Sequence, residues 1–152
     1  MYDTLTLANS SKPKVMSLEG RIGRVRLLAW SLVLFAATIG GICLVALLSS
    51  SMSLDLGGLM MIGLLSARIL SMLFIVQRLH DLNWSGWFCW LSILPWVGNF
   101  FILVLVLMPG TRGSNRFGAP PVPNNNAVVI LAWLWLVLVA GLAYVTVTRP
   151  GI

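Results

Sequence analysis

Four stretches of this chain are long, apolar and almost free of charge, and they restrict its possible folds more than any other feature. They cover residues 27–49, 56–77, 84–108 and 127–148. Each has about the 20 residues that an α-helix needs to cross the hydrocarbon core of a bilayer, where a helix satisfies its own backbone polar groups. The stretches therefore predict an all-α, polytopic integral membrane protein, built as a bundle of four transmembrane helices.

The composition also indicates a membrane protein. Hydrophobic residues make up 59% of the chain and charged residues 9%, whereas a soluble domain has about 25% charged residues. The longest polar tracts are residues 1–26 and the Gly/Pro/Asn-rich loop 109–126, so we predict a single membrane domain over residues 27–148. The first stretch is longer than the core of a signal peptide, which has about 7–15 residues, and we expect it to be retained.

Basic residues gather in front of the first stretch, in a chain whose net charge is +6. Lys12, Lys14, Arg21, Arg24 and Arg26 form the flank that is expected to stay in the cytoplasm. Residues 1–26 are therefore predicted to be a cytoplasmic basic segment. Membrane topology explains this charge without a nucleic-acid partner. Where these side chains bind a ligand, we expect the anionic headgroups of the phospholipid bilayer.

The third apolar stretch has two possible structures. Residues 84–107 would make a helix of about 36 Å, enough for one span, whereas its two halves would each reach only about half way across. Length therefore favours one spanning helix that is kinked at Pro95. The alternative is that residues 84–107 form a re-entrant helical hairpin. With one span, the polar clusters at residues 78–81 and 110–118 lie on opposite faces of the membrane.

Arg68 lies near the middle of the second stretch, where a charge costs roughly 2.5–3.5 kcal/mol on insertion scales. The acidic residues all lie outside the apolar stretches, so carbonyls, hydroxyls, water, a lipid phosphate or another subunit must compensate it. On the same helix, Gly63, Ala67 and Ser71 recur every four residues, a pattern that lets two helix backbones approach closely. The stripe predicts a close helix contact, within the chain or with another chain.

A polar cluster follows the second stretch. We expect Arg78, His80 and Asp81 to cap the C-terminal end of that helix, with Asp81 holding an arginine in place. The next residues include three tryptophans at intervals of three, typical of rings that anchor a helix at the headgroup level: Trp84, Trp87 and Trp90.

Catalytic and metal-binding patterns are not evident in the sequence. His80 and Asp81 are adjacent, which does not give the geometry of a hydrolase triad. No HExxH motif and no phosphate loop is present. Cys43 and Cys89 are expected to be small buried hydrophobic residues. We predict no catalytic residue, no metal and no cofactor.

The loop 110–118 combines three glycines with Asn115 and two arginines, among them Arg116. Such a loop can be a rigid turn, or its exposed amides beside arginines can bind an anion. The proline-rich residues that follow are predicted to be an extended linker that ends at the fourth helix, with Asn126 as a candidate N-cap.

Together these motifs resemble the bacterial inner-membrane proteins of domain-of-unknown-function family 805. The resemblance covers residues 18–118 and rests on Gly20-Arg21-x-x-Arg24, Arg78-Leu79-His80-Asp81, Ser85-Gly86-Trp87, Pro95-x-x-Gly98 and Gly110-Thr111-x-Gly113-x-Asn115-Arg116-Phe117-Gly118. It implies the bacterial inner membrane and implies no reaction. The chain departs from the family pattern at Leu27 and Leu28, where an aromatic pair is usual, and in its additional C-terminal apolar stretch.

Three functions remain open at this stage. The first is a non-enzymatic accessory or interaction subunit, or a homo-oligomer, with a membrane-protein partner. The others are a small transporter or channel subunit that uses Arg68 and a protein that binds or processes lipid headgroups at the cytoplasmic interface. The candidate contacts for a partner, lipid or anion are Arg21, Arg24, Arg68, Arg78, His80, Asp81, Asn115 and Arg116.

Overall fold

The computed structural model describes residues 18–49 and 55–148. Within them the chain is all-α, as predicted, and forms five helices: α2 (Arg24–Ser49), α3 (Leu56–Asp81), the 3-10 helix η1 (Gly86–Ile93), α4 (Val97–Leu107) and α5 (Asn126–Thr148). The first 17 residues of the basic segment, with Lys12 and Lys14, lie outside the described residues.

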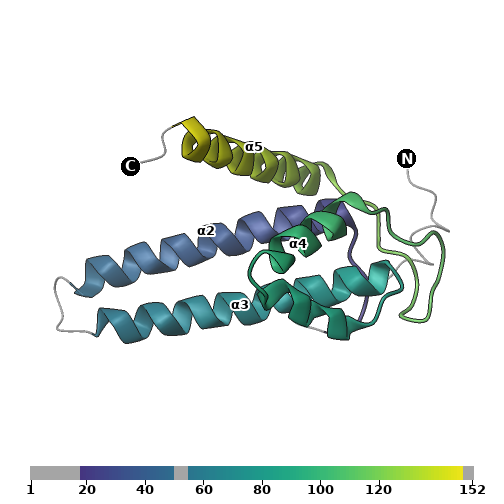
Figure 1. Cartoon of the computed structure of the whole chain (residues 1–152), viewed down its shortest axis with the longest axis horizontal. Coiled ribbons are helices and arrows are strands. Elements are labelled where there is room, and N and C mark those ends of the chain that lie inside the picture. Colours follow the sequence, from purple (N-terminus) through teal and green to yellow (C-terminus); the bar gives the residue numbers. More distant parts are fainter. Residues whose placement is uncertain (1–17, 50–54, 149–152) are drawn as a thin grey trace.

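Three of these helices are long and apolar enough to cross a membrane: α2, α3 and α5, with 26, 26 and 23 residues. Helices α2 and α3 run antiparallel and side by side, and α5 lies along the other side of α2 (Figure 1). Phe35 of α2 and Trp135 of α5 contact each other, with ring centroids 5.3 Å apart. Most side chains of the three helices are exposed in the isolated chain, as expected where lipid would cover them.

The third apolar stretch is not one helix, and the prediction of a single span kinked at Pro95 is wrong. Helix η1 has 8 residues and α4 has 11, and the two pack against each other. The chain reverses between them at Trp96, whose φ of 64° lies in the left-handed region. A Cβ at Gly98 would lie 2.6 Å from the Ser92 carbonyl oxygen, so only glycine permits this close approach. Residues 84–107 thus form the helical hairpin of the alternative prediction.

The hairpin packs against the C-terminal half of α3. Their shared core is a cluster of buried apolar side chains, completed by Trp84: Ile75, Val76, Leu79, Leu82, Cys89, Phe101 and Leu105. In Figure 1, η1 and α4 lie along only the N-terminal half of α2 and the C-terminal half of α3. Cys89 is buried as predicted, whereas Cys43 is exposed in the isolated chain, so the prediction that it is buried is wrong.

The ends of the helices differ from the predicted ones by a few residues. Helix α3 continues to Asp81, and the turn after it includes Asn83 with φ 62°, a conformation that asparagine tolerates. Helix α5 is capped by Asn125, whose Oδ1 accepts a hydrogen bond from the Val128 amide at 3.0 Å. The predicted N-cap, Asn126, is the first residue of the helix instead.

Candidate functional site

A buried polar cluster joins four segments at one end of the molecule, and Asp81 lies at its centre. This last residue of α3 is only 3% exposed. Its Oδ1 accepts hydrogen bonds from Arg21 Nε and Nη2 at 3.2 and 3.1 Å. Its Oδ2 accepts a hydrogen bond from Arg78 Nη1. One carboxylate therefore pairs with two buried guanidinium groups, which leaves the cluster with an excess positive charge.

Arg21 enters the cluster from the segment before α2 and fills the loop 110–118. Its Nη1 donates to the carbonyl oxygens of Gly113 and Gly118 at 2.7 and 3.1 Å. Its Nη2 donates to the carbonyl and hydroxyl oxygens of Thr111 at 2.7 and 3.0 Å. The side chain is 1% exposed. The glycine loop thus presents carbonyl groups to a cation of its own chain.

Arg78 ties the hairpin to α3. Its Nε donates to the Leu105 carbonyl oxygen at 2.9 Å, and its Nη2 donates to the Met108 carbonyl oxygen. These carbonyls belong to the last turn of α4 and the residue after it, where a helix leaves its carbonyl groups without partners inside the helix. A fully buried guanidinium therefore caps α4 and holds the exit of the hairpin beside the end of α3.

The start of the glycine loop is bonded to the end of α3 by its backbone. The Thr111 amide and hydroxyl both donate to the Asp81 carbonyl oxygen, at 2.8 and 2.9 Å. Asn115 Nδ2 donates to the His80 carbonyl oxygen at 2.8 Å and to Thr111 Oγ1 at 2.9 Å. A Cβ at Gly110 would lie 2.0 Å from Asp81 Oδ2, so the loop approaches the carboxylate closely only because residue 110 is glycine.

His80 and Arg116 lie at the rim of the cluster around Phe117. The His80 ring stacks on the Phe117 ring, with centroids 3.8 Å apart and planes 10° from parallel. The Arg116 guanidinium lies 4.7 Å from the centre of the same ring. It also donates to the Asn83 carbonyl oxygen at 3.0 Å. Phe117 thus holds both the His80 and the Arg116 side chains. In the sequence, only its place in the loop motif pointed to such a role.

Two further arginines lie beside the cluster on the first turn of α2. Arg24 is exposed and makes one long hydrogen bond of 3.5 Å to the Leu107 carbonyl oxygen. Arg26 is 5% exposed and donates from Nη2 to the Pro123 carbonyl oxygen at 3.3 Å. Its Nη1 is buried without a hydrogen-bond partner. Arg26 therefore ties the linker before α5 to α2, a role that its place in a basic flank does not reveal.

The structure brings most of the predicted polar residues together, and it corrects one prediction about them. Arg21, Arg78, His80, Asp81, Asn115 and Arg116 lie at the same end of the bundle. The clusters at 78–81 and 110–118 were expected on opposite faces of the membrane, and this is wrong. The prediction failed because a length of 24 residues suits one span as well as a hairpin, whereas the hydrogen bonds of Arg78 decide between them.

Arg68 and the small-residue stripe lie elsewhere, toward the middle of α3. Arg68 Nη2 donates to the Ser92 carbonyl oxygen, at the tip of the hairpin, at 2.6 Å. The Ser71 hydroxyl donates to the Arg68 carbonyl oxygen. Gly63 and Ala67 line a hollow that faces α2, and a Cβ at Gly63 would meet nothing within 4 Å. The predicted close contact is therefore not made at Gly63 within the chain.

The three predicted anchor tryptophans differ in exposure. Trp84 is half-buried against the hairpin core, whereas Trp87 and Trp90 point outward from η1 and are 78% and 56% exposed. That they lie at the headgroup level stays a prediction.

The central residues of the buried cluster are bonded to one another and to backbone carbonyls. Both carboxylate oxygens of Asp81 accept hydrogen bonds from guanidinium groups, and Arg21 and Arg78 are buried against backbone carbonyls. Within the described residues, no group of three or more histidine, cysteine, aspartate or glutamate side chains could hold a metal ion. What the arrangement can do is fix the backbone of four segments in one place.

The chain belongs to the family described as protein of unknown function DUF805, whose model matches residues 15–119. That range contains every residue of the buried cluster and ends before α5. The family and the three long apolar helices establish a multi-pass membrane protein.

Two inner-membrane proteins of Escherichia coli K12 are similar to this chain. Inner membrane protein YhaI is 32% identical over 97 residues, which are 64% of this chain and 80% of that protein. Inner membrane protein YhaH is 42% identical over 45 residues, which are 30% of this chain and 37% of that protein, so the match spans well under half of YhaH. No solved structure matches the chain. These relatives place the chain in the inner membrane.

Proposed function

We propose that this chain is a non-enzymatic interaction protein of the bacterial inner membrane, either an accessory subunit of a larger assembly or a homo-oligomer. The observation that carries the proposal is how the polar groups are used. Three charged side chains that could otherwise bind a ligand are at most 3% exposed: Arg21, Arg78 and Asp81. They bind one another or backbone carbonyls. The helices leave many large apolar side chains accessible, which suits contact with other membrane helices.

The proposed membrane arrangement has three spans and one re-entrant hairpin. Eight residues of 3-10 helix and 11 residues of α-helix each rise roughly 16 Å, about half of the hydrocarbon core. The hairpin therefore enters from one face and returns to it, and Arg68 of α3 donates a hydrogen bond to the Ser92 carbonyl oxygen shortly before its turn. Helix α5, which starts at the same end, then carries the chain to the opposite face (Figure 1).

The charge distribution supports a cytoplasmic location for the end with the buried cluster. All described arginines except Arg68 lie at or beside that end: Arg21, Arg24, Arg26, Arg78, Arg112 and Arg116. Short loops rich in arginine and lysine stay in the cytoplasm. We therefore propose a cytoplasmic N-terminal segment and a C-terminal end on the opposite, periplasmic side.

The test of the interaction function is the assembly state in a membrane-like environment. The full chain is extracted with native lipid into polymer nanodiscs, and its mass is determined by native mass spectrometry. We expect a homo-oligomer or a defined complex with another inner-membrane protein in a fixed ratio. A strictly monomeric chain at the concentration found in the cell membrane would overturn the proposal.

Binding of anionic lipid headgroups is a second candidate, favoured by one observation. The exposed arginines Arg24, Arg112 and Arg116 lie at the same end of the molecule. Each such side chain near an acidic surface gains roughly 1 kcal/mol. Co-purified phosphatidylglycerol should fall in the triple variant Arg24→Gln/Arg112→Gln/Arg116→Gln and remain in Arg68→Gln. Equal lipid content in both variants would remove this candidate.

A further inference from the structure

Arg68 is a charged group with spare hydrogen-bond donors at the middle of the proposed bilayer. It lies 12 residues from the start of α3 and 13 from its end, or about 18–20 Å from each. A guanidinium has five N–H donors. Within the described part of the chain, only Nη2 has an assigned partner, the Ser92 carbonyl oxygen at 2.6 Å. A charge at this depth with so little compensation marks a contact site.

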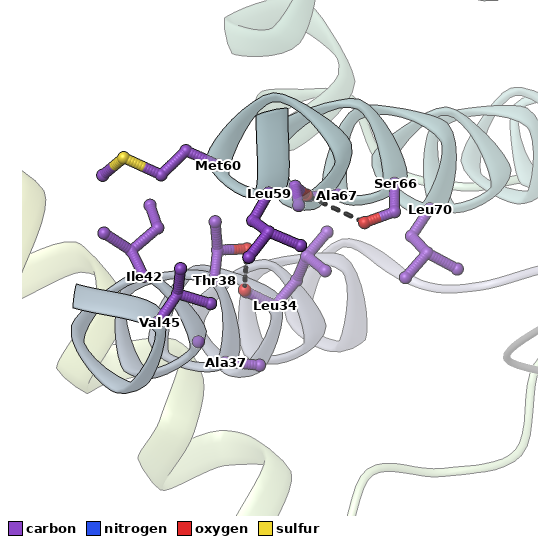
Figure 2. A pocket seen from close by; sticks show the side chains of 12 residues that line it. Leu34, Ala37, Thr38, Ile42, Val45, Leu59, Met60, Ser66, Ala67 and Leu70 are labelled. Carbon is purple, nitrogen blue, oxygen red and sulfur yellow. Dashed lines mark hydrogen bonds between the residues drawn. The ribbon is translucent and has the colours of Figure 1, made fainter. Parts of the chain in front are cut away.

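The surface beside Arg68 is hollow. Helices α2 and α3 face each other across a groove of about 270 Å³, and Figure 2 shows side chains from both helices pointing toward it. Its walls include small residues from both helices, Ala37 and Gly41 on α2 and Gly63 and Ala67 on α3. A second hollow of about 330 Å³ shares Leu34, Thr38 and Ala67 with the first and reaches Arg68 and Trp135. We call these two neighbouring hollows together the α2–α3 groove.

The hydroxyl groups of the groove already donate hydrogen bonds within their own helices. Ser31 and Thr38 donate to the carbonyl oxygens of Leu27 and Leu34, at 2.8 and 2.7 Å. Ser66 donates to the Gly63 carbonyl oxygen at 2.8 Å, and this bond and that of Thr38 are drawn in Figure 2. Among the residues that line the groove, Arg68 is the one with a charged side chain.

The described residues of a second copy offer no complementary charge at this depth. The acidic residues among them are Glu19, Asp55 and Asp81. Asp55 and Asp81 lie at the two ends of α3, about 18–20 Å along the helix from Arg68, and Glu19 precedes the first span. A parallel or an antiparallel copy of α3 would instead place its own Arg68 near this depth. An acidic partner for Arg68 would therefore come from a different molecule.

We infer that the α2–α3 groove binds a transmembrane helix of a different protein, one that carries a single aspartate or glutamate at mid-depth, which pairs with Arg68. Small residues in the walls let a helix backbone approach closely, and the pair is formed where water is excluded. This inference rests on the proposed interaction function and names the chemistry of the partner. It favours an accessory subunit over a homo-oligomer.

The experiment uses a synthetic peptide as the partner. The full chain with Cys43→Ala, Cys89→Ala and Ser114→Cys is labelled with a donor dye and reconstituted in phosphatidylcholine vesicles. A 23-residue Leu/Ala peptide with lysines at both ends carries an acceptor dye and one glutamate at its centre. The matched peptide has glutamine there. We expect the glutamate peptide to bind roughly ten-fold more tightly, a preference lost in Arg68→Leu and in Arg68→Gln and kept in Arg116→Gln.

Each outcome decides the inference. Equal affinity of the two peptides overturns it, and so does a glutamate preference that survives in Arg68→Leu or Arg68→Gln. Displacement of the peptide by equimolar oleate would assign the site to a fatty-acid carboxylate and would also overturn it. Identical elution of the variants in size-exclusion chromatography shows that they fold. If only the peptide preference fails, the assembly measurement can still succeed, so failure of this inference is distinct from failure of the interaction function.

Discussion

The two ends of the α2–α3 pair differ in what holds them. At the end near Arg21, four segments meet and their charged side chains are buried in hydrogen bonds. Toward the other end, α2 and α3 face each other across an open, apolar groove. Lipid tails are as apolar as leucine, so burial of apolar surface gives little direction to helix packing in a bilayer. The comparison shows that the rare polar groups decide where this chain folds back on itself.

The largest effect is expected from Asp81→Asn, which keeps the shape and removes the only carboxylate of the buried cluster. It leaves Arg21 and Arg78 buried without an opposite charge, and loss of one partner of a buried ion pair costs about 3–5 kcal/mol. The free energy of unfolding in bicelles titrated with dodecyl sulfate measures this. The control is Asp55→Asn at the N-cap of α3, where asparagine caps equally well. Equal losses in both variants would contradict the special role of the cluster.

A second test keeps every charge and adds a methyl group to the glycine loop, where it lies against Asp81. Gly110→Ala would place Cβ 2.0 Å from Asp81 Oδ2 and force the loop away from α3. Overpacking of this kind costs typically about 1–3 kcal/mol. The same unfolding assay applies, with Gly41→Ala as the control because a Cβ there meets nothing within 4 Å. A neutral Gly110→Ala variant would show that the loop is not held against Asp81.

Asn115→Ala tests the loop alone. The variant loses the hydrogen bonds to the His80 carbonyl and to Thr111 Oγ1 and the one from the Phe117 amide, each worth about 0.5–1.5 kcal/mol. We expect trypsin to cleave faster after the exposed Arg112 and Arg116, with a modest loss of global stability. Ser114→Ala, at an exposed neighbouring position, should leave the cleavage rate unchanged. Unchanged cleavage in Asn115→Ala would argue against an ordered loop.

The smallest effect on stability is expected from Arg68→Leu. Removal of a charge at mid-depth offsets the loss of its one bond to the Ser92 carbonyl, so stability should change by no more than about 1 kcal/mol. Arg78→Leu, at the buried cluster, should cost several times more because it frees the carboxylate and the carbonyls of Leu105 and Met108. Similar losses from the two substitutions would mean that the two ends of the pair do not differ as described.

The sequence predicts the secondary structure well where apolar length decides it. Helices were expected over 56–77 and 127–148, and α3 and α5 cover 56–81 and 126–148. It also predicts that Asp81, in the polar cluster after the second apolar stretch, holds an arginine in place, and Asp81 pairs with Arg78 and Arg21. The partner Arg21 lies 60 residues away, and no local pattern connects the two.

The hairpin could not be derived from length, because residues 84–107 are long enough for one span. The information lies in tertiary contacts: Arg78 requires the carbonyls of α4, and Trp96 takes a left-handed conformation that a proline-kinked helix does not need. The same contacts place the glycine loop beside Asp81 and turn its carbonyls toward Arg21. Roles such as those of Thr111 and Phe117 follow from that placement and were not visible in the sequence.

The side of the membrane on which the glycine loop lies is the most direct test of this fold. In a chain with Cys43→Ala and Cys89→Ala, Ser85→Cys and Ser114→Cys are introduced one at a time and labelled with an impermeant maleimide in spheroplasts and in inverted vesicles. Because Asp81, Thr111 and Arg21 are hydrogen-bonded to one another, both cysteines should react in inverted vesicles and neither in spheroplasts. Labelling of the two positions from opposite faces would contradict the hairpin and the buried cluster together.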